Sequence, residues 1–207
     1  LVIGKSEITK EKIFAIMGAG VVGALAYTFT DSFWFSAVEG EVYASSSFFT
    51  AVVFWCIFKW ENAADEPHNL RWLILIAYLM GLSIGVHLLN LLTIPALAFV
   101  YYFRKYEVST KGIIYTSIIS LFILAFIQYG IIQEMLSLAG SFDLFFVNTL
   151  GMPFGTGIII YSILIIGVLI WGLRYTKKKN IPLGNTAVLC VIFILIGYSS
   201  FAQIVIR

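Results

Sequence analysis

The sequence predicts an all-α protein, a polytopic transmembrane helical bundle. Three observations lead to this prediction: 60% of the 207 residues are hydrophobic, only 12% are charged, and the mean hydropathy is +0.97. Ordinary soluble domains are about 45–50% apolar and about 25% charged, so a water-soluble core could not absorb this excess. A transmembrane barrel is excluded because barrel strands alternate apolar and polar residues, whereas the apolar runs here are continuous.

The apolar runs predict about seven spans in one transmembrane domain that covers residues 1–207. A spanning helix needs roughly 20 apolar residues, with about 17–25 tolerated. The predicted spans are 13–30, 43–58, 72–87, 89–103, 112–133, 155–173 and 186–205. The third and fourth runs are short and are interrupted by Gly81, Gly85, Asn90 and Pro95. We therefore predict a tight hairpin of two short helices over 72–103, with one long tilted helix as the alternative.

The distribution of basic residues favours the hairpin. With seven spans, twelve of the thirteen Lys and Arg residues fall on one face of the membrane, and only Arg207 lies opposite. The positive-inside rule assigns the crowded face to the cytoplasm. The outer face then receives residues 31–42, the tip of the hairpin and the loop 134–154, so any chemistry is expected on that side.

Several kinds of site are not indicated by the sequence. Cys56 and Cys190 lie inside apolar runs and give no disulfide or metal framework. No P-loop, dinucleotide fingerprint or HExxH motif occurs, so we expect neither a metal nor a cofactor. The start of the chain, LVIGKSEITKEK, lacks the order of a signal peptide and an initiator Met. We therefore expect an internal fragment of a longer chain.

The first candidate site is the stretch DSFWFSAVEGEVYASSSFF at 31–49, which places Asp31, Glu39 and Glu41 beside aromatic rings. On one straight helix Glu39 and Glu41 would point about 200° apart, at about 100° per residue. We expect an interfacial helix or a bent connection, with the aromatic residues at 33–35 at headgroup depth and one glutamate facing inward. The alternative is an aromatic belt with solvated acids.

The second candidate site is GLSIGVHLLN at 81–90. Gly81 and Gly85 are four residues apart, a pattern that permits close helix approach. His87 and Asn90 are three residues apart, so a helix would place them on one face, where a bundle interior or an aqueous cavity must supply partners. The alternative is that His87 is a satisfied packing residue.

The loop EMLSLAGSFDLFFVNTLGMPFGTG carries apolar residues at close to helical spacing. We expect Gly140 to break this pattern and Gly151 to end it. The loop is therefore predicted to be an amphipathic segment on the outer leaflet over 134–154, where a lipid substrate could enter sideways. A re-entrant connector is the alternative.

Three stretches resemble a bacterial membrane family long labelled a domain of unknown function. They are DSFWFSAVEGEVYASSSFFTAVVFWCIFKWENAADEPHNLRW, GLSIGVHLLNLLTIPAL and FFVNTLGMPFGTG. That family is related to a eukaryotic transmembrane protein O-mannosyltransferase and is grouped with the GT-C glycosyltransferases. The likeness covers essentially the whole chain, and it implies a GT-C-like fold in a bacterial cytoplasmic (inner) membrane.

The resemblance implies a glycosyltransferase that uses a polyprenyl-phosphate sugar donor. The sugar, with mannose as one candidate, would pass to a hydroxyl acceptor, with protein Ser or Thr as one candidate, on the extracytoplasmic side. In such enzymes an acidic residue deprotonates the acceptor hydroxyl. The family's early external motif, an aromatic followed by Asp and then Gly-Glu-Phe, does not occur here. The catalytic base is therefore expected upstream, and the fragment alone should be inactive.

The resemblance also implies roles for six residues, which would bind substrate or support the groups that do: Asp31, Glu39, Glu41, Tyr43, His87 and Asn90. Two other functions compete with this interpretation. A transporter or lipid flippase would also show polar residues in its spans and helices broken by Gly or Pro, although no convincing internal repeat is present. A non-catalytic membrane scaffold is the other alternative. No nucleic-acid partner is expected.

Overall fold

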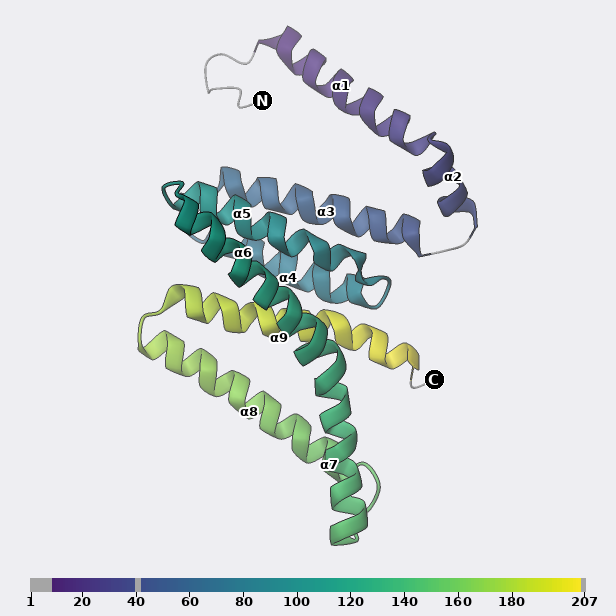
Figure 1. Ribbon diagram of the computed structural model, residues 1–207, viewed down its shortest axis with the longest axis vertical. Coiled ribbons are helices and arrows are strands. Elements are labelled where there is room, and N and C mark those ends of the chain that lie inside the picture. The colour runs from purple at the N-terminus through teal and green to yellow at the C-terminus, as the bar shows by residue number, and fades with distance from the viewer. Residues whose placement is uncertain (1–8, 40–41, 206–207) are drawn as a thin grey trace. The chain divides into compact units, whose positions relative to one another are not determined.

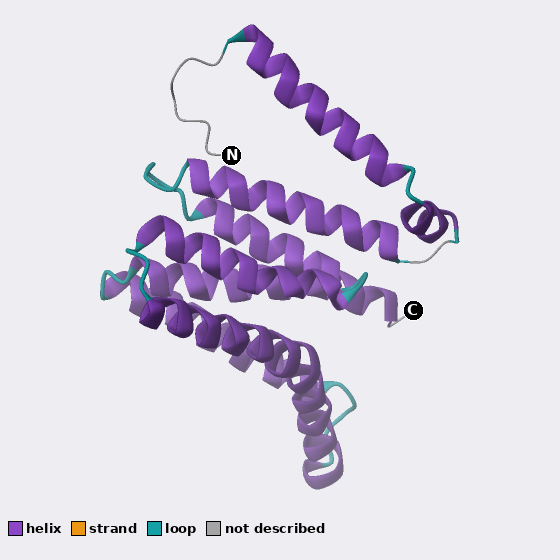
Figure 2. Cartoon of the chain, turned by 45° about the horizontal axis from the view of Figure 1, so that its top comes forward, coloured by secondary structure: helices purple, strands orange, loops and turns teal. Residues whose placement is uncertain are grey.

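The computed structural model describes residues 9–39 and 42–205, and every regular element in these ranges is helical (Figure 1, Figure 2). The elements are α1 (Lys10–Thr28), α2 (Asp31–Val38), α3 (Tyr43–Asn62), α4 (Arg71–Ile84), η1 (Leu88–Leu92), α5 (Thr93–Lys105), α6 (Thr110–Ala125), η2 (Phe126–Glu134), α7 (Met135–Leu150), α8 (Thr156–Lys178) and α9 (Pro182–Val205). The predicted all-α class is confirmed.

Within the described part of the chain, four helices are long and apolar enough to cross a membrane, which defines an integral membrane protein. They are Lys10–Thr28, Thr110–Leu150, Thr156–Lys178 and Pro182–Ser200, and α2 with α3 would make a fifth as one broken span. Helix length and composition give four or five spans among the described residues, so they do not reproduce the predicted count of about seven spans. Helices α4 and α5 have 14 and 13 residues, fewer than the roughly 17 that a span needs. Seven spans and a GT-C-like fold stay predictions.

The chain divides into two compact units, Leu1–Ser45 and Ser46–Arg207, and each is described by itself. The N-terminal unit contains α1 and α2. Helix α1 begins where the Thr9 hydroxyl accepts a hydrogen bond from the backbone N–H of Lys12. Its side chains are exposed along its whole length, as expected of a helix whose solvent is lipid.

The second unit contains the predicted hairpin. Helix α4 ends at Ile84, η1 makes the turn, and α5 returns to the connection between α3 and α4. There the Lys105 ammonium donates to the Ala64 carbonyl at 2.5 Å, and the Arg104 guanidinium pairs with Asp65. Since Asp65 precedes Arg71 by six residues, the start of α4 and the end of α5 lie at the same end of the unit. The hairpin is confirmed, and the alternative of one tilted helix over 72–103 is wrong.

Helix α9 runs parallel to α4 and starts at this same end. The Cys190 thiol lies 3.7 Å from the Leu73 carbonyl, and further along both helices Gly81 meets Ile194. The α3–α4, α5–α6 and α8–α9 connections therefore share one end of the second unit. All Lys and Arg residues described in this unit lie there: Lys59, Arg71, Arg104, Lys105, Lys111, Arg174, Lys177, Lys178 and Lys179. We call this the basic end; its assignment to the cytoplasm stays a prediction.

Helices α4 and α9 cross at two glycines. A Cβ built on Gly81 would lie 2.9 Å from the Ile194 Cα and closer still to the Ile194 carbonyl oxygen. A Cβ on Gly197 would lie 2.6 Å from the Tyr78 carbonyl oxygen. Both distances are below any ordinary carbon contact, so only glycine permits this approach. The close approach that the glycine spacing predicts is confirmed at Gly81, whose partner is Gly197 in α9, and it stays a prediction at Gly85.

The segment predicted to be an amphipathic interfacial segment at 134–154 is helical as far as Leu150. Helices α6, η2 and α7 form one continuous helix of 41 residues that bends at the π-helical segment η2 (Figure 1). The break expected at Gly140 is wrong, because an isolated glycine costs a helix only about 1 kcal/mol. The end expected at Gly151 is confirmed. Gly151 is left-handed, with φ +66°, and Met152 donates to the Phe146 carbonyl, which closes the helix.

Candidate functional site

The predicted site residues fall in both units of the chain. Asp31, Glu39 and Tyr43 belong to the N-terminal unit, where all three side chains are exposed, and His87 and Asn90 belong to the second unit. Glu41 lies outside the described residues, so the expected contrast between a buried and an exposed glutamate stays a prediction. The expected approach of His87 and Asn90 to the 31–43 connection also stays a prediction, because the two units are described separately.

The stretch with the carboxylates forms a short helix, as expected. Asp31 is the first residue of α2, where a negative charge interacts favourably with the helix N-terminus. Aromatic rings join the end of α1 to α2: Tyr27 lies 4.7 Å from Phe33, and Phe29 stacks on Trp34 at 5.8 Å between ring centroids. The exposed indole of Trp34 suits a position at the membrane surface.

A chain of polar side chains fixes the turn between α4 and α5. The Asn90 amide donates to the Ser83 hydroxyl at 2.9 Å, and that hydroxyl donates to the Met80 carbonyl at 2.8 Å. The Thr93 hydroxyl donates to the Asn90 carbonyl at 2.7 Å. Ser83, Asn90 and Thr93 are all buried, so these bonds satisfy groups that would otherwise be costly in an apolar bundle. We call these three residues the turn cluster.

One atom of the turn cluster has no partner. Asn90 is fully buried, and its side-chain carbonyl oxygen Oδ1 accepts no hydrogen bond among the described residues. A buried acceptor without a donor costs about 1–3 kcal/mol, so such atoms are rare in folded proteins. Asn90 therefore presents an acceptor that a ligand hydroxyl or a further protein group could satisfy.

His87 lies at the edge of the turn cluster, but it is not on the helix face expected for it. Its backbone is extended, and its ring nitrogen Nδ1 accepts a hydrogen bond from the Leu89 N–H at 3.1 Å, which caps η1. The ring is half-buried. The expectation that His87 and Asn90 share one helix face is wrong because α4 stops at Ile84, three residues before His87.

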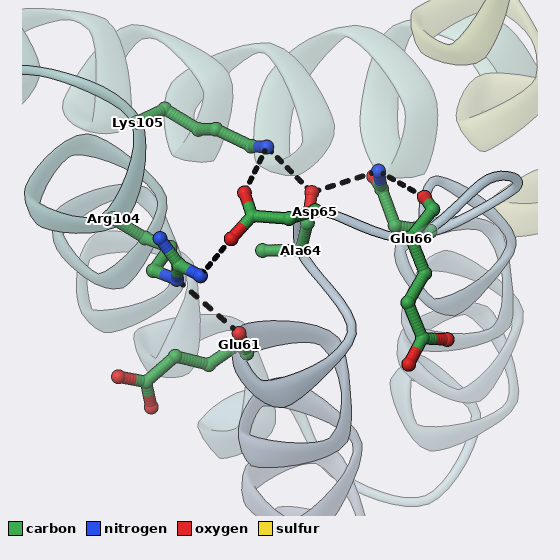
Figure 3. Close-up of polar contacts among 7 residues, drawn as sticks. Glu61, Ala64, Asp65, Glu66, Arg104 and Lys105 are labelled. Carbon is green, nitrogen blue, oxygen red and sulfur yellow. Dashed lines mark hydrogen bonds and ion pairs between the residues drawn. The ribbon is translucent and has the colours of Figure 1, made fainter.

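An ionic cluster at the basic end was not predicted from the sequence (Figure 3). Asp65 receives hydrogen bonds from Arg104 and Lys105, while Arg104 also donates to the Glu61 carbonyl. The Arg104 guanidinium, and after it Lys105, lowers the pKa of the Asp65 carboxyl below its usual value. The cluster is exposed and holds the α3–α4 connection against the end of α5, so its role is structural.

A buried carboxylate also joins α7 to α8. Asp143 accepts hydrogen bonds from the Gly157 N–H at 2.9 Å and the Gly155 N–H at 3.2 Å. Only 5% of its surface is exposed, and the N-cap residue of α8 is a glycine without a side-chain acceptor. Asp143 takes over that function from the neighbouring helix. The sequence analysis did not predict this contact.

Metal ligation finds no support in the described ranges 9–39 and 42–205. No three His, Cys, Asp or Glu side chains there lie in a group that could hold a metal ion. The polar groups brought together are hydroxyls, amides and one imidazole at the α4–α5 turn. Groups of this kind bind hydroxyl-bearing ligands by hydrogen bonds.

Fold and composition together define the class, a helical integral membrane protein with a polar turn inside its bundle. Residues 1–110 match the N-terminal domain of protein O-mannosyl-transferase TMEM260. The match covers more than half of the chain, so the chain belongs to this family and is an O-mannosyltransferase-related membrane protein. No curated protein and no solved structure matches the chain.

Proposed function

We propose that this chain is part of a membrane glycosyltransferase. The enzyme transfers a sugar, mannose being the first to test, from a polyprenyl-phosphate donor to a hydroxyl acceptor such as protein Ser or Thr. The observation that supports this proposal is the family match over residues 1–110, which contains all six candidate site residues. The proposed location is the bacterial cytoplasmic membrane, with about seven spans, a GT-C-like fold and the basic end in the cytoplasm.

The turn cluster supports the choice of binding residues. It lies at the end of α4 opposite the basic end, which the positive-inside rule would place on the extracytoplasmic side. In the proposal, the unpaired oxygen of Asn90 accepts a hydrogen bond from a sugar or acceptor hydroxyl, and His87 is a further polar group of the same turn. The other four candidate residues, Asp31, Glu39, Glu41 and Tyr43, are likewise proposed to bind or orient substrate.

The catalytic base is proposed to lie outside these residues. An inverting transfer needs one carboxylate that removes the acceptor proton while the anomeric carbon is attacked, together with polar groups for the departing phosphate. The family's external acidic motif would supply that carboxylate, and this sequence does not contain it. The six residues then bind and orient substrate, so their loss lowers transfer without abolishing it.

The two histidines provide a matched pair of variants for the test. Asn at position 87 keeps an acceptor for the Leu89 N–H, as a good N-cap residue, but removes the imidazole. His68, in the exposed α3–α4 connection, has φ +66°, a conformation that Asn tolerates well. The full-length protein in lipid vesicles is supplied with a labelled polyprenyl-phosphate mannose and a Ser/Thr peptide, and transfer per folded molecule is measured.

We expect His87→Asn to lower transfer about tenfold, the effect of losing one polar contact of about 1.4 kcal/mol. His68→Asn should transfer at the wild-type rate. Near-wild-type transfer by His87→Asn, together with a reduced folded yield, would show that His87 only packs. No transfer by the wild-type protein with any polyprenyl-phosphate sugar, or sugar movement across the membrane without transfer, would refute the proposed function.

A further inference from the structure

An apolar cavity that is open on one side lies between α4, α5, α6, η2 and α9 of the second unit. Its volume is about 590 Å³, within the range of about 300–1,000 Å³ typical of small-molecule sites. The wall consists mainly of aliphatic and aromatic side chains, among them Met80, Ile94, Ile123, Ile127, Val191 and Ile194. A cavity of this composition selects a hydrocarbon over a polar ligand.

The wall has few polar side chains, and two of them, Tyr102 and Thr186, already form hydrogen bonds within the protein. The Tyr102 hydroxyl donates to the Glu107 carbonyl at 3.0 Å and accepts from the Ser109 N–H at 2.8 Å. The Thr186 hydroxyl donates to the Pro182 carbonyl within its own helix. The donor hydrogens of these two hydroxyls are therefore already used within the protein, which again favours an apolar occupant.

The cavity is long and follows the helix axes. Along α9 its wall extends from Leu183 to Ile194, and along α6 and η2 it extends from Thr116 to Ile127. At 1.5 Å per residue each of these stretches measures about 16 Å. A cavity of this length and of modest volume suits one extended chain better than a compact ring system.

One end of the cavity coincides with the basic end of the unit. Tyr106 and Leu183, which line it there, belong to the α5–α6 connection and the first turn of α9. The nine Lys and Arg residues of the basic end outnumber the four acidic residues of the same connections: Glu61, Asp65, Glu66 and Glu107. Basic pockets between transmembrane helices attract anionic lipid headgroups, at about 1 kcal/mol per Lys or Arg near the surface.

We propose that this cavity binds one hydrocarbon chain of an anionic membrane phospholipid, with the headgroup at the basic end. The headgroup end of this lipid site lies at the end of α4 opposite the turn cluster, and Met80 and Ile94 line the other end of the cavity, next to that cluster. The phospholipid fills space between α4 and α9 on one side and α5 and α6 on the other. It therefore acts as a structural ligand of the helical unit.

The test uses a photoactivatable lipid in the full-length protein. Phosphatidylglycerol with a diazirine in one acyl chain is incorporated into phosphatidylcholine vesicles that contain the protein, and phosphatidylcholine with the same chain serves as the headgroup control. After irradiation, cross-linked peptides are mapped by mass spectrometry. Ala98 lines the cavity whereas Ala96, on the same helix and also half-buried, does not, so Ala98→Phe and Ala96→Phe form a matched pair.

We expect cross-links on α5 and α9, reduced at least threefold by Ala98→Phe and unchanged by Ala96→Phe, with several-fold less labelling by phosphatidylcholine. If Ala98→Phe fails to fold, Ala187→Phe, at an exposed lining position, replaces it. Equal labelling in both variants, or cross-links only on outward-facing residues, would refute the cavity as a lipid site. Equal labelling by the two lipids would refute the headgroup assignment. Displacement by unlabelled polyprenyl phosphate but not by phosphatidylglycerol would show that the occupant is the sugar donor, which would overturn this proposal.

Discussion

Replacing Gly81 with Ala tests the crossing of α4 and α9 directly. The added Cβ would lie 2.9 Å from the Ile194 Cα and 3.0 Å from its carbonyl carbon. These neighbours are backbone atoms, so no side-chain rotation can relieve the contact, and the helices must move apart. Overpacking of this kind costs about 1–3 kcal/mol. Ala is better than Gly in a helix by up to about 1 kcal/mol, so the net destabilisation should be about 0–2 kcal/mol.

Gly167 provides the matched control for this substitution. It lies in the middle of α8, and a Cβ there would meet no atom within 4 Å. Gly167→Ala therefore keeps the gain in helix propensity without the clash and should stabilise the protein by up to about 1 kcal/mol. The difference between the two variants, about 1–3 kcal/mol, isolates the cost of the clash.

Thermal unfolding in detergent can be followed with a thiol-reactive fluorophore, because Cys56 is fully buried and reacts only when the bundle opens. The midpoint for Gly81→Ala should fall, and that for Gly167→Ala should stay the same or rise. Equal midpoints for the two variants would refute the glycine crossing. A lower midpoint for both variants would show that Ala at position 167 does not bring the expected gain in helix stability.

Three further predictions concern single side chains. Asp143→Asn leaves an amide facing the Gly157 N–H and should lower the free energy of unfolding by about 1–3 kcal/mol. The Gly157 amide hydrogen should then exchange faster with solvent. Unchanged exchange at Gly157 would contradict the role of Asp143 as the cap of α8. The pKa of the Asp65 carboxyl is lowered in the folded state, so its ion pairs stabilise the protein at pH values above the ordinary carboxyl pKa. This stabilisation is lost as the pH falls through the lowered pKa of the folded state. Wild type and Asp65→Asn should therefore differ in midpoint at neutral pH and converge in acid. Cysteines at Arg71 and Arg104 should label from the same side of the membrane; labelling from opposite sides would refute the hairpin.

The bilayer made the main features of the fold predictable. A chain this apolar must satisfy its backbone hydrogen bonds inside each segment, which leaves helices as the solution for continuous apolar runs. Charge then decided the topology: only a hairpin at 72–103 gathers the basic residues, and Asp65 is bound by Arg104 as that hairpin requires. Gly81 could be found because four-residue spacing of small residues is a local signal.

The parts that sequence reasoning missed depend on non-local contacts. Asp143 caps α8 from a neighbouring helix, and the only local sign was that the first residues of α8 follow a glycine, which offers no side-chain acceptor. Gly197 has its partner in α4, far away in the sequence. The end of α4 at Ile84 was missed because the apolar run continues beyond it, and hydropathy alone does not mark where an apolar helix becomes a 3₁₀ turn.

The crossing of α4 with α9 also has a consequence for biosynthesis. About 115 residues separate Gly81 from Gly197, so α4 leaves the ribosome long before α9 is made. At about 5–20 residues per second, the bare glycine surface of α4 stays uncovered for roughly 6–20 s. During that interval any other inserted segment with a small-residue face can compete for it, and insertion factors that hold α4 apart would prevent such mispairing. The docking of α9 then covers the glycine surface of α4, so it is the step that fixes the native arrangement of these two helices.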